Sequence, residues 1–432
     1  MSFLYSDSSE NTPEERSGHI AVYYNGHILV WGGYHDIEWY HDEDDIVMVD
    51  RYLSNYQLWL YNLETKSWCE KYGDLEDLIP PPLSGSCAIC IGNKMYLFGG
   101  HTPSSGTSAE IFVLDLKSYI WQRITDDLEG EIQPSPRDKF GCWQHNDCIV
   151  YFGGYGVPPS LASRPPNKAG EFIMNTVDRL PDRRGWNNYV FMLDTEQMKW
   201  IIPEIKGDPP SPRAAFATAK IASRAYLFGG RFMDTRLNDL HYLDLDKWQW
   251  SGSLTTAGCV PEGRTWHSLT AVSDKHLFLY GGLNNNSDAL GDAYILDTES
   301  LVWSQIPTDA SLPSSKTVRM WHTACNTSTP GEVVIFGGSS KSILKYENPA
   351  IQEVIIFRFS ALPLSRLAGD AVLKYCRQMK SILKNLQSLG KHGIIHDSAA
   401  CQASGAWPSL RGRETRLYKI LLPVKLAVLG LA

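Results

Sequence analysis

Residues 226–250, YLFGGRFMDTRLNDLHYLDLDKWQW, decide the fold of this chain. An apolar run ends in the pair Gly229-Gly230, a short turn follows, a second run alternates from Leu240, and Trp250 closes the stretch. Aromatic-rich and alternating runs separated by a turn indicate two antiparallel strands joined in a hairpin. The two glycines have no side chains, so they allow the backbone of a neighbouring sheet to pass close by.

The same pattern occurs six times along the chain. An aromatic residue and two glycines also stand at Trp31-Gly32-Gly33, Phe98-Gly99-Gly100, Phe152-Gly153-Gly154, Tyr280-Gly281-Gly282 and Phe336-Gly337-Gly338. Five of the six pairs are followed by a tryptophan: Trp68, Trp121, Trp200, Trp250 and Trp303. In five copies an arginine stands three residues before a histidine or phenylalanine: Arg16, Arg137, Arg213, Arg264 and Arg319. A repeat of roughly 50 residues with these markers resembles the kelch repeat, and kelch arrays close into β-propellers.

We therefore expect an all-β fold, a six-bladed kelch β-propeller over residues 1–359. The sixth copy, from Arg319 to Phe359, supplies three strands and no tryptophan strand. A sheet lacking one strand would leave an open edge. The segment near Phe3 to Tyr5 is therefore expected to supply the fourth strand of that blade.

Composition limits the possible functions. The chain has 432 residues, of which 43% are hydrophobic, enough to bury the core of one large ring domain with an appendage. Its formal net charge of −8 argues against a nucleic-acid surface. The nine cysteines are odd in number and scattered, which is typical of reduced thiols in a cytosolic or nuclear protein. We expect no cofactor.

Two weaker signals also argue against a metal site and a membrane segment. Cys87-x-x-Cys90 is the only close cysteine pair. In a strand its two side chains would point to opposite faces, which disfavours a zinc site. Met1 to Pro13 is polar, unlike a secretory signal. The apolar segment Leu417 to Ala432 is short and includes two lysines and a proline, which argues against a membrane span.

Two repeats carry insertions. The first insertion contains the acidic residues Asp36, Glu38, Asp42, Glu43, Asp44, Asp45 and Asp50. Such a segment could bind a divalent cation or a basic partner, although a solvated loop is the simpler interpretation. The second insertion runs from Tyr155 to Asn188 and contains several prolines, which indicates a shaped loop. Both occupy equivalent positions in their repeats, so we expect them on one face, where binding would occur.

The character of the chain changes after Phe359. Apolar residues recur at helical spacing between residues 360 and 389, and Gly390 follows. This amphipathic helix either packs on the rim of the propeller or docks onto a partner. Residues 390–432 mix serine, glycine, alanine and charged residues, and we interpret them as an atypical, flexible tail.

The helix resembles an elongin BC box, by which substrate receptors of cullin-RING ubiquitin ligases attach to elongin C. The matching residues are Pro363, Leu364, Ala368 and Val372. Together with kelch repeats that contain ERSGH, FGGYG, RGWN and WHTAC, this box makes residues 15–372 similar to the subfamily of kelch domain-containing proteins 1 and 2. Two stretches, PEIKG and WSG, lean towards the first of these. The resemblance implies non-catalytic substrate receptors that bind elongin B and elongin C and present C-terminal degrons, chiefly chain ends in glycine.

One part of the subfamily pattern is missing. Such receptors follow the BC box with a cullin box, often Leu-Pro-x-x-Leu, within one or two helices. This chain has only Leu422-Pro423-Val424-Lys425-Leu426, about fifty residues further on. The sequence therefore leaves open whether cullin-2, cullin-5 or neither is recruited.

The residues themselves predict a binding mouth. In a propeller, equivalent positions of the blades form rings around the axis. The residues after each glycine pair give one ring: Tyr34, His101, Tyr155, Arg231, Leu283 and Ser339. The residues after the repeated arginines give a second ring, which includes Lys139, Trp266 and Trp321. With Arg236 close to Arg231 in the sequence, cations among aromatic side chains favour a carboxylate ligand. Alternatively, Arg231 and Arg236 pair with acids between blades, as we expect of the repeated arginines.

The resemblance assigns degron recognition to a larger set of positions. They are Tyr34, Lys139, Tyr155, Trp186, Asn187 or Asn188, Arg231, Arg236, Thr265, Trp266 and Trp321. Thr265 replaces the serine of the relatives, and its hydroxyl is expected to donate a hydrogen bond to the ligand.

Two other classes of protein share this fold. A copper oxidase needs converging histidine and tyrosine ligands, but His19, His267 and His322 stand at a repeated position and are more simply structural. A sialidase needs an arginine triad and Ser-x-Asp turns, which the sequence lacks. A scaffold that binds internal motifs, without ligase recruitment, remains the alternative. Such a scaffold would tolerate an amidated peptide.

Overall fold

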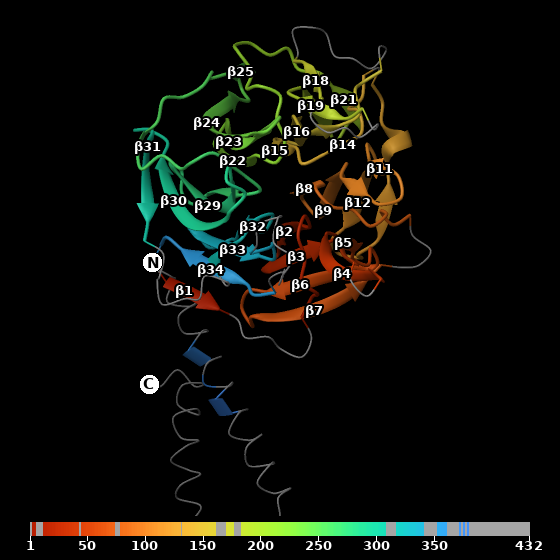
Figure 1. Cartoon of the computed structure of the whole chain (residues 1–432), viewed down its shortest axis with the longest axis vertical. Helices are drawn as coiled ribbons and strands as arrows, with labels where there is room; N and C mark the ends of the chain where they lie inside the picture. Colours follow the sequence, from red (N-terminus) through yellow and green to blue (C-terminus); the bar gives the residue numbers. More distant parts are fainter. Residues whose placement is uncertain are drawn as a thin grey trace, which may run out of the picture. The chain divides into compact units, whose positions relative to one another are not determined.

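The computed structural model describes a ring of six sheets (Figure 1). The described residues are 2–5, 12–42, 45–73, 78–130, 132–160, 170–176, 183–307, 317–340, 352–360 and five single positions between 371 and 379. The four main strands of each sheet pair in antiparallel fashion and carry one copy of the repeat, so the chain forms the six-bladed β-propeller that the sequence predicts.

The blades are numbered 1 to 6, and the strands of each blade are named in order from the inside of the ring to the outside. Blade 1 has β2 (Ile20–Tyr24), β3 (His27–Trp31), β6 (Gln57–Asn62) and β7 (Ser67–Tyr72). Blade 2 has β8 (Cys87–Ile91), β9 (Lys94–Phe98), β12 (Ile111–Asp115) and β13 (Trp121–Arg123). Blade 3 has β15 (Gly141–His145), β16 (Cys148–Phe152), β20 (Val190–Asp194) and β21 (Lys199–Ile201).

The other three blades follow the same order. Blade 4 has β22 (Ala217–Ile221), β23 (Arg224–Phe232), β24 (Thr235–Asp244) and β25 (Gln249–Trp250). Blade 5 has β28 (Ser268–Ala271), β29 (His276–Asn284), β30 (Ala289–Asp297) and β31 (Val302–Ile306). Blade 6 has β32 (Thr323–Asn326), β33 (Glu332–Phe336), β34 (Ile355–Arg358) and, outermost, β1 (Ser2–Tyr5).

The N-terminal strand completes blade 6. Strand β1 pairs antiparallel with β34, from Ser2 opposite Arg358 to Tyr5 opposite Ile355. The innermost strands contact each other in the cyclic order β2, β8, β15, β22, β28, β32 and back to β2. The ring is therefore closed by a sheet that joins the two ends of the propeller sequence, and β34 is not an edge.

The glycine pairs bring neighbouring blades together, as the sequence predicts. In all six blades the first glycine has a positive φ, and a Cβ placed on it would lie 2.4–3.0 Å from a backbone carbonyl oxygen of the next blade. At Gly281 this oxygen belongs to Arg319, at 2.4 Å. A side chain cannot be accommodated at that distance, so glycine is required where one blade meets the next.

The five late tryptophans also join blades. Each packs on the aromatic residue that precedes the glycine pair of the preceding blade, with ring centroids 4.8–5.6 Å apart. Trp303 on Phe228, at 5.3 Å, is one example. The buried apolar side chains form six clusters, and each cluster is shared by two adjacent blades. The core is thus a set of interfaces between blades, and no blade buries its apolar faces alone.

Some blades carry short sheets in addition to their four main strands. The insertion in the first repeat is an antiparallel hairpin of β4 (Tyr34–Asp42) and β5 (Asp45–Tyr52), and not the irregular loop that we expect from the sequence. Its run of β-branched residues from Ile46 favours a strand. In blade 3, β14 (Arg137–Asp138), β17 (Tyr155–Gly156), β18 (Phe172–Met174) and β19 (Gly185–Asn187) form a small sheet.

The remaining short elements lie in blades 2 and 5 and in the connection after blade 2. They are β10 (His101–Thr102), β11 (Gly106–Thr107), the 3-10 helix η1 (Thr125–Asp127), β26 (Ala257–Gly258) and β27 (Arg264–Thr265).

The chain divides into two compact units, Met1–Pro363 and Leu364–Ala432. Of the expected helix over 360–389, the described positions Ala371, Val372, Tyr375, Gln378 and Met379 are helical. Pro363, Leu364, Ala368 and the tail 390–432 lie outside the described residues. Within the described part of the chain, no helix is long and apolar enough to span a membrane.

Candidate functional site

A ring of backbone hydrogen bonds surrounds the axis of the propeller at one end. We call it the collar, and its members are Gly18, Gly85, Lys139, Ala215, Trp266 and Trp321, one from each blade in order. The N–H of each member donates to the carbonyl of the member before it at 2.7–3.2 Å, and Gly18 closes the ring on Trp321. All six residues have φ between 54° and 66°. The collar fixes the positions of whatever side chains its members carry.

The residues after the glycine pairs lie just outside the collar. Each forms a β-bridge or strand pair with the residue that precedes a collar member. The pairs are Tyr34 with Ser17, His101 with Ser84, Tyr155 with Asp138, Arg231 with Ala214, Leu283 with Thr265, and Ser339 with Met320. The two rings predicted from the sequence therefore lie together at one mouth.

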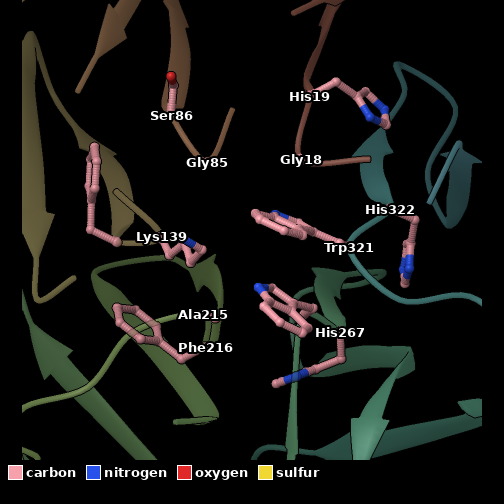
Figure 2. A pocket seen from close by; sticks show the side chains of 12 residues that line it. Gly18, His19, Gly85, Ser86, Lys139, Ala215, Phe216, His267, Trp321 and His322 are labelled. Carbon is pink, nitrogen blue, oxygen red and sulfur yellow. The ribbon is translucent and has the colours of Figure 1, made fainter. Parts of the chain in front are cut away.

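The collar surrounds a cavity of about 160 Å³. Its lining consists of the collar members and of the residue that follows each of them, which includes His19, Phe140, Phe216, His267 and His322. Figure 2 shows Lys139 facing Trp321 across the opening, with Gly18 and Gly85 at one end. Trp266 and Trp321 stack with ring centroids 4.9 Å apart.

Lys139 is the cationic member of the collar. Its ammonium group pairs with the buried Asp138 and lies 5.3 Å from the ring centroid of Trp321. An ammonium group has three donors, so the Asp138 contact leaves hydrogen-bonding capacity for a ligand. The side chain is 23% exposed, which keeps it within reach of the mouth.

Arg231 and Arg236 face each other on a hairpin of blade 4. They are direct cross-strand partners in the β23–β24 pair. Arg231 Nε donates to the Met233 carbonyl at 2.6 Å, and its Nη2 is 3.7 Å from Asp234 Oδ1. The Nε of Arg236 is buried and has no partner among the described residues. Burial, and then the charge of Arg231, lower the pKa of Arg236. Like charges placed directly opposite destabilise a strand pair, so this arrangement favours an anion between the two guanidinium groups.

The repeated arginines have a different role. Their Nη1 atoms donate to the first glycine of their own blade, for example Arg213 to the Gly229 carbonyl at 3.1 Å. Arg213 also binds Asp239, and Arg264 binds Asp292, each through two hydrogen bonds of 2.6–2.9 Å. Both acids belong to the same blade as their arginine, so the expected pairing between blades is wrong for these two. Arg231 and Arg236 do not share this arrangement.

Aromatic side chains of blades 1 and 6 form one side of the mouth. Tyr34 packs edge-on against Trp321 at 5.5 Å and stacks with Tyr52 at 5.7 Å. The Tyr52 hydroxyl is 2.8 Å from His101 Nδ1 and 3.2 Å from Ser84 Oγ. Burial raises the pKa of Tyr52 and lowers the pKa of His101. Tyr52 was not predicted because it lies at the end of the first insertion, outside the register of the repeat.

The blade 3 insertion forms another side. Tyr155 contacts Trp186 at 5.1 Å, and Trp186 contacts Phe232 of blade 4 at 5.9 Å. The guanidinium of Arg184 lies 5.3 Å from the centroid of the Tyr155 ring. Trp186 itself is only 3% exposed. It therefore supports Tyr155 and Phe232 from beneath rather than forming open surface.

Asn187, Asn188 and Thr265 serve the fold of the loops in this structure. Asn187 accepts from Arg137 at 2.9 Å and donates to the Gly154 carbonyl at 3.0 Å. Asn188 accepts from the Glu171 N–H and donates to the Pro210 carbonyl. The Thr265 hydroxyl donates to the collar carbonyl of Ala215 at 2.9 Å. All three are at most 3% exposed, and their contact with a ligand stays a prediction.

The histidines of the cavity are held within the propeller. His322 Nε2 is 2.9 Å from Ser268 Oγ, and His19 Nε2 is 2.8 Å from Thr323 Oγ1. Across the described residues, no group of three or more histidine, cysteine or acidic side chains could hold a metal ion. Cys87 and Cys90 pack into different interface clusters, on opposite faces of β8, as the strand interpretation requires.

Fold and mouth together define a kelch-repeat propeller. The chain matches the family model KLHDC2/KLHL20/DRC7 Kelch-repeats domain over residues 48–164 and 181–338, and it belongs to this family. It is 39% identical to bovine (Bos taurus) kelch domain-containing protein 2, over 91% of this chain and 92% of the relative. It is 40% identical to the human (Homo sapiens) kelch domain-containing protein 2, over 89% and 90%, and 38% identical to human kelch domain-containing protein 1, over 85% and 86%.

Proposed function

We propose that this chain is a non-catalytic substrate receptor of a cullin-RING ubiquitin ligase and that it binds the free C-terminal end of its substrates. The observation that carries the proposal is the cross-strand pair Arg231 and Arg236 at the aromatic mouth. Guanidinium groups bind a carboxylate through paired, charge-assisted hydrogen bonds. A chain end is the carboxylate that every protein has, and it is also the one that an extended peptide can insert deepest.

The surroundings favour a small last residue. Arg231 of the arginine hairpin pairs with Ala214, next to the collar member Ala215, and Phe232 of the same hairpin packs on Trp186. A carboxylate between the two arginines would leave little room beside the last Cα, which favours glycine. Lys139 would bind a backbone carbonyl of the peptide, because such a group cannot be buried without a partner.

The proposal is tested with matched peptides. Glycine-ending peptides with free-acid and amidated C-termini should be compared by fluorescence anisotropy against the full chain. We expect amidation to weaken binding at least about tenfold, because it removes one charge-assisted interaction of about 1.5–3 kcal/mol. Equal affinity for the two forms would exclude C-terminal recognition and leave the scaffold for internal motifs.

Ligase recruitment is the second part of the proposal. Support comes from Val372 and Tyr375, which are helical and 53% and 47% exposed, an apolar surface suited to a helix-docking partner. Elongin B and elongin C should co-purify with the chain, and cullin-2 or cullin-5 with them. Leu364→Glu should abolish this co-purification while leaving the melting temperature of the propeller unchanged. Retention of elongin C by the variant would show that the box is wrongly placed.

A further inference from the structure

Two cysteines of neighbouring blades face each other just below the collar. Cys87 lies on β8 of blade 2 and Cys142 on β15 of blade 3, and these two innermost strands are in contact. Both side chains pack on the same cluster, the one shared by blades 2 and 3. The Cys87 thiol donates to the Phe140 carbonyl at 2.9 Å, and Phe140 stands two residues before Cys142. The Cys87 side chain therefore reaches across the interface to the segment that carries Cys142.

The alternation of side chains along β15 directs Cys142 towards blade 2. A Cβ placed on the preceding residue, Gly141, would lie 2.5 Å from Thr218 and 2.6 Å from Phe216, both of blade 4. Because consecutive side chains of a strand point to opposite faces, Cys142 points away from blade 4 and towards Cys87. The two thiols are close enough to hydrogen-bond with each other.

This pair differs from the other cysteines and can be reached from the axial cavity. Of the seven cysteines in the part of the chain that the structure describes, Cys87 and Cys142 alone pack on a common cluster. Both are partly buried, and neither is completely enclosed. Ser86, which precedes Cys87, and Phe140 line the cavity. The cavity therefore gives a small reagent a route from the mouth to the pair.

We propose that Cys87 and Cys142 are a reversible oxidation site, at which hydrogen peroxide joins blades 2 and 3 through a disulfide. One thiol, as its thiolate, attacks peroxide, so that the O–O bond breaks and a sulfenic acid forms. The second oxygen takes up the proton that the first thiol released and leaves as water. The other sulfur then displaces the sulfenic oxygen, which leaves with the proton of the second thiol as another water. The two sulfurs lose two electrons in total, and peroxide gains them.

The disulfide would reinforce the collar between these two blades. Lys139 donates its N–H to the Gly85 carbonyl at 2.8 Å, and these two residues stand three positions before Cys142 and two before Cys87. A covalent link at this place restricts the unfolded chain, which is the main way in which a disulfide stabilises a protein. We expect the melting temperature to rise by several degrees on oxidation and to return on reduction.

The test uses the full wild-type chain. It is treated with hydrogen peroxide at about pH 9, alkylated in denaturant, and digested without reduction. The alkaline pH is chosen because the contact with Cys142, and then burial, raise the pKa of the Cys87 thiol well above its usual value, and the thiolate is the form that reacts. We expect mass spectrometry to find the Cys87 and Cys142 peptides joined to each other, and dithiothreitol to separate them.

Two exposed cysteines, Cys69 and Cys259, report whether the oxidant has acted. Cys90→Ser is the matched control, because Cys90 is also a partly buried residue of β8 but packs on the opposite face of that strand. This variant should keep the link, and Cys142→Ser should abolish it, while circular dichroism checks that both fold. The proposal is overturned if Cys69 and Cys259 are oxidised while the Cys87 and Cys142 peptides are recovered separately alkylated. A disulfide from either of them to a different cysteine would also overturn it.

Discussion

Arg231 and Arg236 differ in exposure and in hydrogen-bond partners, and this difference predicts how binding responds to the mutation of each. Arg231 is 39% exposed and already contacts the Met233 carbonyl and Asp234. Arg236 is half-buried, and its Nε has no partner among the described residues. The Arg236 guanidinium therefore gains more from a bound carboxylate, because a buried donor without a partner is costly.

We expect Arg236→Ala to weaken binding of a glycine-ending peptide by about ten- to a hundredfold, and Arg231→Ala by a smaller factor. Isothermal titration with free-acid and amidated peptides measures both. In a double-mutant cycle the loss from Arg236→Ala and the loss from amidation should not add, because both remove the same interaction. Full additivity would show that Arg236 binds something other than the carboxylate.

Individual residues also show where prediction from sequence succeeds. Arg231, Lys139 and Trp321 were placed at the mouth because the repeat assigns each position of a blade to a ring. The hydrogen bonds of Asn188 and Thr265 cannot be predicted, because the sequence does not show which backbone carbonyl a polar side chain will find. Collar positions such as Lys139, Trp266 and Trp321 are predicted as the second ring, but the hydrogen bonds that link the collar are not. Its six members share a backbone conformation and no residue type, so the sequence does not show that their backbones bond to one another.

The hairpin of β23 and β24 is held in place by the neighbouring blade. The Asn285 side chain of blade 5 accepts from the Arg236 N–H at 2.8 Å and donates to the Arg236 carbonyl at 3.0 Å. Gly263 allows this close approach, since a Cβ there would lie 2.1 Å from the Arg236 carbonyl oxygen. The backbone of Arg236 is therefore fixed by two hydrogen bonds that leave its guanidinium group available.

Asn285→Ala should loosen this hairpin and reduce the preference for free-acid over amidated peptide by about three- to tenfold, with little change in melting temperature. The effect should vanish in an Arg236→Ala background. Asn286→Ala is the matched control, because Asn286 is equally exposed in the same turn and makes no side-chain hydrogen bond with another described residue. If Asn285→Ala kept the full preference for free-acid over amidated peptide, the hairpin would not depend on the Asn285 hydrogen bonds.

The outer strand β1 completes the blade that closes the ring. It covers β34, whose residues Ile355 to Phe357 are at most 2% exposed. Deletion of residues 1–12 should lower the melting temperature by at least several degrees, since it opens the sheet that closes the propeller. Leu4→Pro should act in the same direction, because proline cannot donate to the strand ladder. An unchanged melting temperature in both would mean that the ring closes without β1.

The histidines around the cavity make the stability of the whole propeller depend on pH. Burial, and then the charges of Arg16 and Arg264, lower the pKa values of His19 and His267 well below the usual value. Burial, and then Arg319, lower the pKa of His322 to about 3. An unfolded histidine titrates near pH 6.5, so the unfolded chain binds protons that the native state does not. Stability is therefore complete above about pH 6.5 and falls as the pH drops towards 3, by up to about 1.4 kcal/mol per pH unit for each histidine.

Acidic side chains add to this loss only at lower pH. Burial raises the pKa of Asp239, but hydrogen bonds from His241 and Arg213 lower it by more, so the net pKa is below the usual value. That contribution is present above about pH 4, the unfolded value, and disappears below it. Between about pH 6.5 and 4, the change of stability with pH thus comes chiefly from the histidines.

The hydrogen bonds of His19 and His322 differ from the surroundings of His267. His322 and His19 each bond a hydroxyl at the start of the preceding blade's inner strand, Ser268 and Thr323. The equivalent neighbour of His267 is Ala217, and neither ring nitrogen of His267 has a hydrogen-bond partner among the described residues. Blades 3 and 4 carry Phe140 and Phe216 at the same position, so the ring accepts phenylalanine there.

His267→Phe should therefore be neutral or stabilising by about 1 kcal/mol at neutral pH, since it removes two buried polar atoms without a partner. His322→Phe should be destabilising by about 1–3 kcal/mol, because it leaves the Ser268 hydroxyl unpaired. Urea unfolding between pH 4 and pH 7.5 measures both effects. In each variant, the number of protons taken up on unfolding should fall by about one. The slope of the unfolding free energy against pH should decrease accordingly. If His267→Phe lost stability at pH 7 as His322→Phe does, or if neither changed the pH dependence, the imidazoles would not be the neutral, buried groups that this geometry requires.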